Sequence, residues 1–184
     1  MLRTLSEEFG DQIKLVPEVA TLLLGGGFPV PGKDLQWSED WQSAFQSAVL
    51  PVQSSIEDAN ALSAQGNGCK VMICDRGILD GAAYTPGGVT EFCQRYGVNA
   101  GEAIGRYTAV IHLESLATAD PEKYGKANNE NRFEPLERAK ELEMATRRAW
   151  EDHPRHLVIT GQRGIEGKIS EVIGIVRFLL AEKS

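Results

Sequence analysis

Four short apolar runs, separated by stretches with helical periodicity, constrain the fold of this chain more than any other feature of its sequence. They are Ile13 to Val16, Val71 to Cys74, Ala109 to Leu113 and Leu157 to Thr160. Runs without polar alternation indicate strands that are buried on both faces, as in parallel sheets. Because helical patterns lie between them, the sequence predicts an α/β fold with a parallel sheet.

Apolar residues recur at helical spacing between these runs. The faces are Trp37, Trp41, Phe45, Val49 and Val52; Leu136, Ala139, Leu142, Ala145 and Ala149; and Ile165, Ile169, Val172, Val176 and Leu179. Leu2, Leu5 and Phe9, followed by Gly10, predict that the chain begins inside a helix. Since we find no repeat and no dividing linker, we expect a single domain over residues 1–184.

Composition argues against several classes of protein. The 42% hydrophobic and 24% charged residues match an ordinary globular domain. The 19 basic and 26 acidic residues give a net charge of -7 without a basic cluster, which argues against a nucleic-acid partner. Three cysteines, no signal-peptide pattern and no run of ~20 apolar residues predict a cytoplasmic protein without a membrane span.

Polar residues follow each apolar run, and in open α/β sheets ligands bind beyond the carboxyl ends of the strands. These residues are Pro17-Glu18, Asp75-Arg76-Gly77, Glu114 and Gly161-Gln162-Arg163, in chain order. Carboxylates and guanidinium groups at one edge of a sheet suit the transfer of a phosphoryl group.

Asp75 has the form of a Walker B aspartate, whose carboxylate holds the water shell of a Mg²⁺ ion that bridges two phosphates. The alternative is a residue at the end of a strand that caps the next helix. Arg76 could stabilise charge on phosphate oxygens, or could form a structural pair with a carboxylate such as Asp80. The residues alone leave both alternatives open.

Glu18 stands where a carboxylate could accept a proton from a substrate hydroxyl; otherwise it is a solvated residue in the first turn of a helix. Arg132 and Arg138 follow an Asn-rich loop, as expected for a lid, at about residues 120–138, that covers a triphosphate. The alternative for Arg138 is a surface pair with Glu134.

The segment from Gly27 to Asp34 has the Gly-x4-Gly-Lys skeleton of a phosphate-binding loop, but its details do not fit. Asp34 replaces the Ser or Thr that should bind Mg²⁺, and Pro29 and Pro31 remove N–H donors. We expect a turn that lines the substrate side of the site.

The chain carries, in this order, VPEVATLLLGGGFPVPG, VMICDRGILDGAAY, YTAVIHLE, NRFEPLERAKELEMATRRAWEDHP and HLVIT. With these segments nearly the whole chain resembles the NadR-type AAA domain family of P-loop NTPases. The resemblance implies a three-layer, doubly wound parallel sheet of the P-loop kinase type, with strand order 2-3-1-4-5. It also implies that Glu18 is the base, that Asp75 and Arg76 act at Mg²⁺ and phosphate, and that Arg132 and Arg138 belong to the lid.

The sequence departs from this family at its beginning. Family members start with a strand and a glycine-rich Walker A loop ending in Gly-Lys-Ser/Thr, whereas Met1 to Phe9 resembles the helix that follows that loop. The resemblance thus implies that the first, central strand is missing. Either the sequence is truncated or the chain has lost nucleotide binding. We expect residues 1–184 to be poorly stable unless the strands before Asp75 and Glu114 close the gap in the sheet.

The resemblance implies binding of ATP or GTP with Mg²⁺, with Gln162 and Arg163 among the nucleotide contacts. In its full-length form such a protein would be a kinase for a small, nucleoside-like acceptor, and residues 1–184 alone would show little activity. A nucleotide-binding regulatory module is the alternative, because fold analogy does not choose between the two. A third possibility is a degenerate fold kept for protein interactions, indicated by Trp37 and Trp41.

Overall fold

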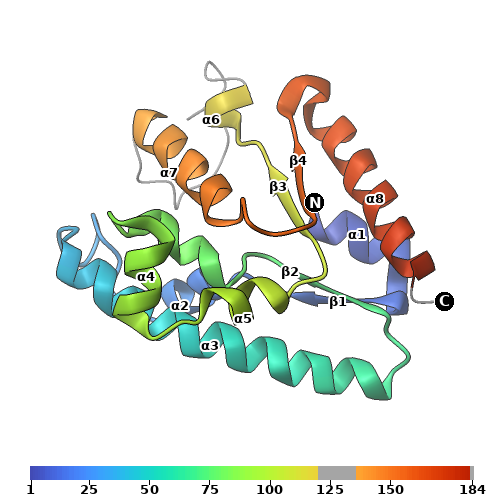
Figure 1. The fold of residues 1–184 in the computed structure, drawn as a ribbon, viewed down its shortest axis with the longest axis horizontal. Helices are drawn as coiled ribbons and strands as arrows, with labels where there is room; N and C mark the ends of the chain where they lie inside the picture. The colour runs from blue at the N-terminus through green and yellow to red at the C-terminus, as the bar shows by residue number, and fades with distance from the viewer. Residues whose placement is uncertain (120–135, 183–184) are drawn as a thin grey trace. The chain divides into compact units, whose positions relative to one another are not determined.

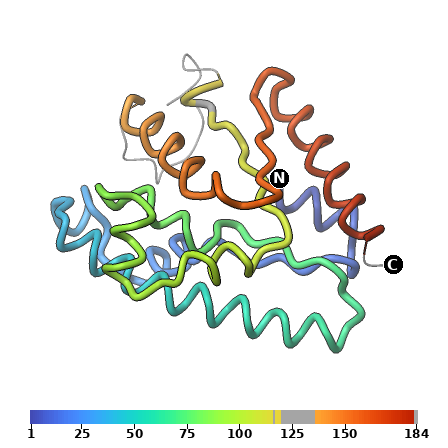
Figure 2. The backbone as a smooth tube through the Cα atoms, viewed as in Figure 1, coloured from blue at the N-terminus to red at the C-terminus, as the bar shows by residue number. Residues whose placement is uncertain are grey.

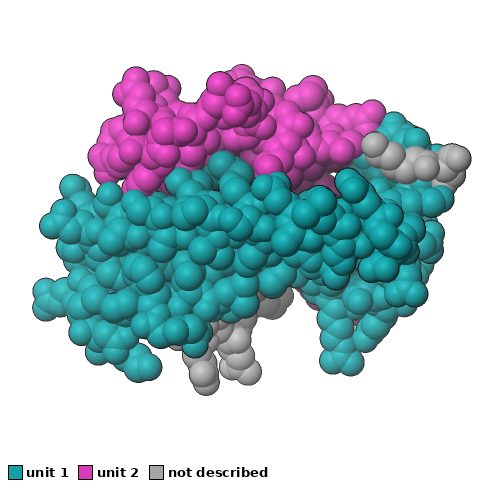
Figure 3. Space-filling view, turned by 90° about the horizontal axis from the view of Figure 1, so that it is seen from below, with its two compact units in different colours: residues 1–78, 172–184 teal, residues 79–171 magenta. Residues whose placement is uncertain are grey.

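A computed structural model describes residues 1–119 and 136–182. The chain divides into two compact units, each described here by itself (Figure 3). Unit 1 comprises Met1–Ile78 and Val172–Ser184, and unit 2 comprises Leu79–Glu171. The expectation of a single domain over residues 1–184 stays a prediction, and most of the expected lid at about 120–138 lies outside the described residues.

Unit 1 holds the first two strands and the longest helix (Figure 1). Its elements are α1 (Leu2–Phe9), a 3-10 helix (Gly10–Gln12), β1 (Ile13–Val16), α2 (Val19–Gly25), α3 (Glu39–Gly66) and β2 (Val71–Cys74). Gly10 ends α1 with a φ of 51°, a conformation that glycine adopts at little cost. Pro17 follows β1 directly, and because proline has no N–H to donate, strand pairing does not continue through it.

Unit 2 contains the other two strands and the shorter helices. Its elements are a 3-10 helix that begins at the unit boundary (Ile78–Tyr84), α4 (Gly88–Tyr96), α5 (Ala100–Gly105), β3 (Val110–Leu113), α6 (Leu116–Ala119), α7 (Leu136–Ala149), β4 (His156–Ile159) and a last 3-10 helix (Gly161–Arg163). The final helix, α8 (Gly164–Glu182), begins in unit 2 and ends in unit 1.

In the part of the chain that the structure describes, four strands form two parallel pairs, β1 with β2 and β3 with β4. Ile13 stands opposite Val71 in the first pair, and Val110 stands opposite His156 in the second. The prediction of α/β structure with parallel strands is therefore confirmed. In the expected order 2-3-1-4-5, strand 1 is the missing strand, and β1 to β4 correspond to strands 2 to 5. The observed pairs are therefore the neighbours 2-3 and 4-5 of that order. The order as a whole stays a prediction.

The prediction that every strand is buried on both faces was wrong. Val16 and Ile159 are buried, but all four residues of β2 are only partly buried, and Leu157 in β4 is exposed. The physical reason is that, among the described residues, each strand has one hydrogen-bonded neighbour, so side chains along its other edge are not flanked by a second strand.

The core of unit 1 forms where α1, α3 and the end of α8 supply apolar side chains. Its buried residues include Leu5, Phe9, Val16, Val19, Phe45, Val172 and Val176. On α3, however, Gln46, Gln53 and Glu57 are more buried than the predicted Val49 and Val52, and Trp37 precedes the helix and is exposed. Figure 2 follows α3 to its end, from which the chain turns back into β2.

Within residues 1–119 and 136–182, no helix is long and apolar enough to cross a membrane.

Candidate functional site

Glu18, Asp75 and Arg76 come together in unit 1, where β1 and β2 end. The backbone N–H of Asp75 donates to the carbonyl of Val16 at 2.9 Å, so the pairing of the two strands continues to the first residue after β2. Glu18 follows Val16 by two residues and begins α2 as its N-cap. Parallel pairing therefore places the two predicted carboxylates at the same edge.

Arg76 bridges this edge with its side chain. Its Nε lies 3.3 Å from Oε1 of Glu18, and the other carboxylate oxygen of Glu18 accepts a 2.5 Å hydrogen bond from the hydroxyl of Thr21. The arginine thus contacts Glu18, and whether it also stabilises charge on phosphate oxygens stays a prediction. Because both side chains of the pair keep contact with water, the pair itself adds little to stability.

Asp75 is at the surface, yet the atoms around its carboxyl group remove part of its hydration. This desolvation, together with the nearby charge of Glu18, raises the pKa of Asp75 above its ordinary value of 3.8. Arg76 and the N-terminal amine of Met1 oppose the rise without cancelling it. Among the described residues, Arg76 and the N-terminal amine therefore do not offset the desolvation of Asp75 and the charge of Glu18.

A hard divalent cation such as Mg²⁺ fits this charge, since it binds through one or two carboxylates and takes its other ligands from phosphates and water. Among the described residues no group of three or more His, Cys, Asp and Glu side chains could hold a metal ion. Asp75 and Glu18 would therefore supply only part of a coordination shell. A second molecule, such as a nucleotide, would have to supply the rest.

The remaining predicted site residues belong to unit 2 or lie outside the described residues. Arg132 lies outside the described residues. Arg138 is on α7 in unit 2, where its exposed side chain pairs with Glu141 at 3.0 Å, while Glu134, the partner considered for it, also lies outside them. Gln162 and Arg163 are exposed in the 3-10 helix after β4, and Arg163 lies 3.6 Å from Glu171.

Glu114, which follows β3, has a structural contact. One of its carboxylate oxygens accepts a 2.6 Å hydrogen bond from the backbone N–H of Gly161, the residue that opens the 3-10 helix after β4. The amine of the buried Lys168 donates to the carbonyl of Glu114. Glu114 thereby joins the segments that follow β3 and β4.

The Gly27 to Asp34 segment uses its own polar groups to close a turn. The carboxylate of Asp34 accepts from the N–H of Val30 at 2.8 Å, and the N–H of Gly32 donates to the carbonyl of Leu35. A phosphate loop must direct such amides toward its ligand. The structure thus agrees with the rejection of this segment as a phosphate loop.

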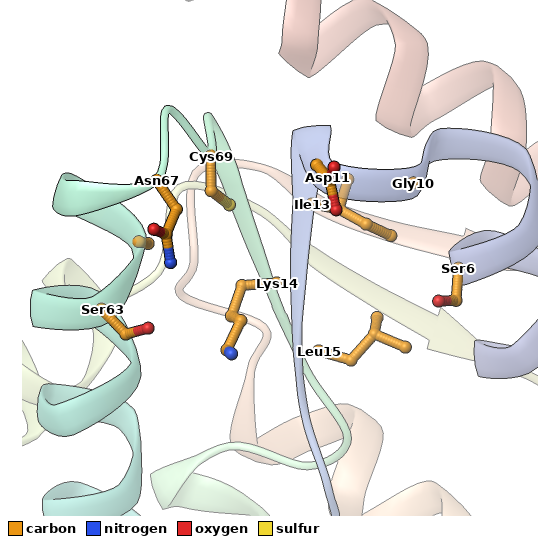
Figure 4. Close-up of a pocket in the computed structure, with 10 residues that line it drawn as sticks. Ser6, Gly10, Asp11, Ile13, Lys14, Leu15, Ser63, Asn67 and Cys69 are labelled. Carbon is orange, nitrogen blue, oxygen red and sulfur yellow. The ribbon is translucent and has the colours of Figure 1, made fainter.

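A hollow of about 700 Å³ lies along β1 in unit 1, toward the amino end of the strand (Figure 4). Its polar lining residues are Ser6, Asp11, Lys14, Ser63, Asn67 and Cys69. Lys14 points toward α3, and Leu15 points to the opposite side of the strand (Figure 4). Glu18 and Asp75 follow the carboxyl ends of the strands, so this hollow is not the predicted site.

Sequence reasoning missed Thr21, Gln53 and Glu57, which contact the site residues or lie behind them. The 3% exposed Gln53 donates to the carbonyl of Arg76 at 3.3 Å and to Oε1 of Glu57 at 2.6 Å. The spacing i, i+4 on α3 places the two residues on one helix face, but only the structure shows that this face is buried. Polar side chains at buried helical positions need a partner, which points to a fixed contact.

A model of the AAA domain family matches residues 1–168 of the chain. A comparison with curated proteins finds no match.

Proposed function

Since the chain belongs to the AAA domain family, whose members are nucleotide-binding proteins of the P-loop NTPase type, we propose that it is a small-molecule kinase. Its NadR-type segments suggest transfer of the γ-phosphoryl group of ATP, or of GTP, to a hydroxyl of a nucleoside-like acceptor. The observation that carries the proposal is the meeting of Glu18, Asp75 and Arg76 at the carboxyl ends of β1 and β2.

Glu18 is suited to the role of general base. Its carboxylate is held on one side by Arg76 and on the other by Thr21, and it remains partly exposed, so an acceptor hydroxyl can approach it. In the proposed reaction the hydroxyl gives its proton to Glu18 while its oxygen bonds to the γ-phosphorus and the bond from that phosphorus to the β-phosphate oxygen breaks. The products are the phosphorylated acceptor and a nucleoside diphosphate.

Asp75 and Arg76 would handle the charge of the phosphates. Asp75 would hold Mg²⁺ through a water molecule, and the ion, when bound, neutralises phosphate charge. The planar guanidinium of Arg76 can turn part of its donors from Glu18 toward phosphate oxygens. Arg132 and Arg138 are proposed to add positive charge as lid residues, and Gln162 and Arg163 to contact the nucleotide.

Residues 1–184 contain no Gly-x4-Gly-Lys-Ser/Thr sequence, which supplies the main phosphate contacts in P-loop proteins. We therefore expect residues 1–184 alone to transfer phosphate slowly or not at all. A form in which a strand and such a loop are joined ahead of Met1 should be the active one.

The test is an acceptor screen on both forms, with the consumption of ATP and GTP followed in the presence of Mg²⁺. A kinase consumes nucleotide only with an acceptor, and Glu18→Gln or Asp75→Asn should lower this rate by about 100-fold or more. Glu102→Gln, which removes an exposed carboxylate that follows no strand, is the control and should leave the rate unchanged.

Two results would contradict the kinase. Tight nucleotide binding with slow hydrolysis that no acceptor accelerates would favour a regulatory module. Failure of the loop-containing form to bind nucleotide would overturn both functions.

A further inference from the structure

Arg76 has an unusual backbone conformation. Its φ of 80° makes it the only residue other than glycine with a positive φ among residues 1–119 and 136–182. This region is disfavoured for any residue with a Cβ atom, so the surrounding structure has to hold Arg76 in it. Residues that adopt such conformations are concentrated at functional sites.

Gln53 provides a contact that holds this backbone. Its side-chain nitrogen lies 3.3 Å from the carbonyl oxygen of Arg76 and 2.6 Å from Oε1 of Glu57, which is completely buried. A carbonyl and a carboxylate can only accept hydrogen bonds, so both need a donor. The amide of glutamine carries two N–H groups on one nitrogen and can serve both acceptors at once.

The conformation of Arg76 is coupled to the position of its side chain, since φ decides where Cβ points. In the observed conformation Nε of Arg76 reaches Glu18 at 3.3 Å, and Thr21 holds Glu18 from α2. A continuous series of contacts thus leads from the buried face of α3 to the carboxylate at the strand ends.

We propose that Gln53, supported by Glu57, is a positioning residue that keeps the backbone of Arg76 left-handed and thereby holds its guanidinium beside Glu18. The meaning of this role for phosphoryl transfer rests on the proposed function. The contacts themselves do not, so they can be tested without nucleotide. The competing interpretation is that the buried pair only stabilises α3.

The first experiment is a stability cycle with Gln53→Met, which keeps the length of the side chain and removes both donors. In the natural background this change should lower Tm by about 5 °C, because the buried carboxylate of Glu57 and the carbonyl of Arg76 each lose one hydrogen-bond donor. In an Arg76→Gly background the loss should be smaller, because glycine adopts the left-handed conformation freely and only the cost of the lost donor contacts remains.

Gln46→Met is the matched control, because Gln46 is similarly buried on α3 and lies two turns before Gln53. Its effect on Tm should be the same in both backgrounds. Equal losses for Gln53→Met in the two backgrounds would overturn the proposal, because the glutamine would then stabilise α3 regardless of the conformation of Arg76.

The second experiment observes the guanidinium itself by NMR of the Nε–H group of Arg76, assigned by its loss in Arg76→Lys. We expect Gln53→Met to move this signal toward the position of a free arginine, as Glu18→Gln does, and Gln46→Met to leave it in place. An unmoved signal in folded Gln53→Met would overturn the proposal. Because neither experiment uses nucleotide, failure of the kinase assay and failure of the positioning role are separate outcomes.

Discussion

Glu143→Gln gives a sharp test of how unit 2 is stabilised. Glu143 lies on α7, and its side chain is 11% exposed. One of its carboxylate oxygens accepts from the hydroxyls of Ser115 at 2.5 Å and Thr118 at 2.6 Å, and the other lies 3.8 Å from Nε2 of His112. The substitution keeps the shape of the side chain and removes its charge.

The magnitude follows from these two hydroxyl contacts. A hydrogen bond to a charged group contributes about 1.5–3 kcal/mol and a neutral one about 0.5–1.5 kcal/mol. Two bonds weakened by about 1 kcal/mol each predict that Glu143→Gln lowers the free energy of unfolding by about 2 kcal/mol near neutral pH. Since Glu143 is nearly buried, screening by water should reduce this value little.

The effect should depend on pH in a defined direction. Burial alone would raise the pKa of Glu143, but the hydrogen bonds from Ser115 and Thr118 together lower it below 4.5. A lowered carboxyl pKa means that, as the pH falls, the unfolded chain binds the proton before the folded chain does. This stabilisation is therefore present above pH 4.5 and is lost as the pH falls through the lowered pKa. The destabilisation by Glu143→Gln should therefore shrink in acid.

Two histidines of unit 2 add to the acid sensitivity of the natural chain. Burial lowers the pKa of His112 and of His156 from 6.5, and the two imidazole rings lie 6.1 Å apart. As the pH falls below 6.5, the unfolded chain binds protons that the folded chain does not, and stability decreases until the lowered pKa values are passed. This loss should persist in Glu143→Gln.

Trp150 can report the unfolding of unit 2, because it is buried there and the chain has only 3 tryptophans. In a background of Trp37→Phe and Trp41→Phe, urea unfolding would be followed by its fluorescence at about pH 7 and about pH 4. The control is Glu141→Gln, an exposed carboxylate on the same helix, expected to change stability by less than about 0.5 kcal/mol. A loss for Glu143→Gln that is equal at both pH values would refute the reasoning.

Three other substitutions test separate contacts. Asp75→Asn should raise Tm near neutral pH, because a raised carboxyl pKa means that the charged carboxylate disfavours folding. Calorimetry should show that this gain disappears below pH 3.8, and the absence of a gain near neutral pH would contradict this account. Gly161→Ala should cost about 1–3 kcal/mol in urea unfolding, since its Cβ would lie 2.0 Å from that of Ala119; a neutral result would show that the segment moves freely. Arg138→Ala should change stability by less than about 0.5 kcal/mol, as its pair with Glu141 is exposed, while a loss of phosphate transfer in the active form would support its lid role.

Much of the local structure could be predicted from the sequence. The apolar runs locate the four strands of the described residues. β1 and β2 have the predicted ends, β3 begins one residue later than predicted, and β4 is shifted by one residue. Ala149, the last residue of the predicted apolar face, is also the last residue of α7. On α8, by contrast, Ile165 continues the apolar period but is 65% exposed, because periodicity predicts a face and does not show where its packing partners end.

The candidate site was predictable in part. Glu18, Asp75 and Arg76 could be named because side chains that follow parallel strands collect at one edge. The contact between Arg76 and Gln53 joins residues 23 positions apart, and no spacing rule relates them. The left-handed backbone of Arg76 was equally hidden, since arginine has no preference for it.

The sequence by itself determined the local elements and the chemical character of the site, because strand and helix formation depend on near neighbours and on the spacing of apolar residues. Only the tertiary structure decided that the strands pair two by two, that Arg76 binds Glu18, and that Glu57 is buried. These outcomes depend on which residues, far apart in the sequence, pack together and thereby exclude water. Burial and hydrogen-bond partners are properties of the folded chain, and they set both the pKa of Asp75 and the conformation of Arg76.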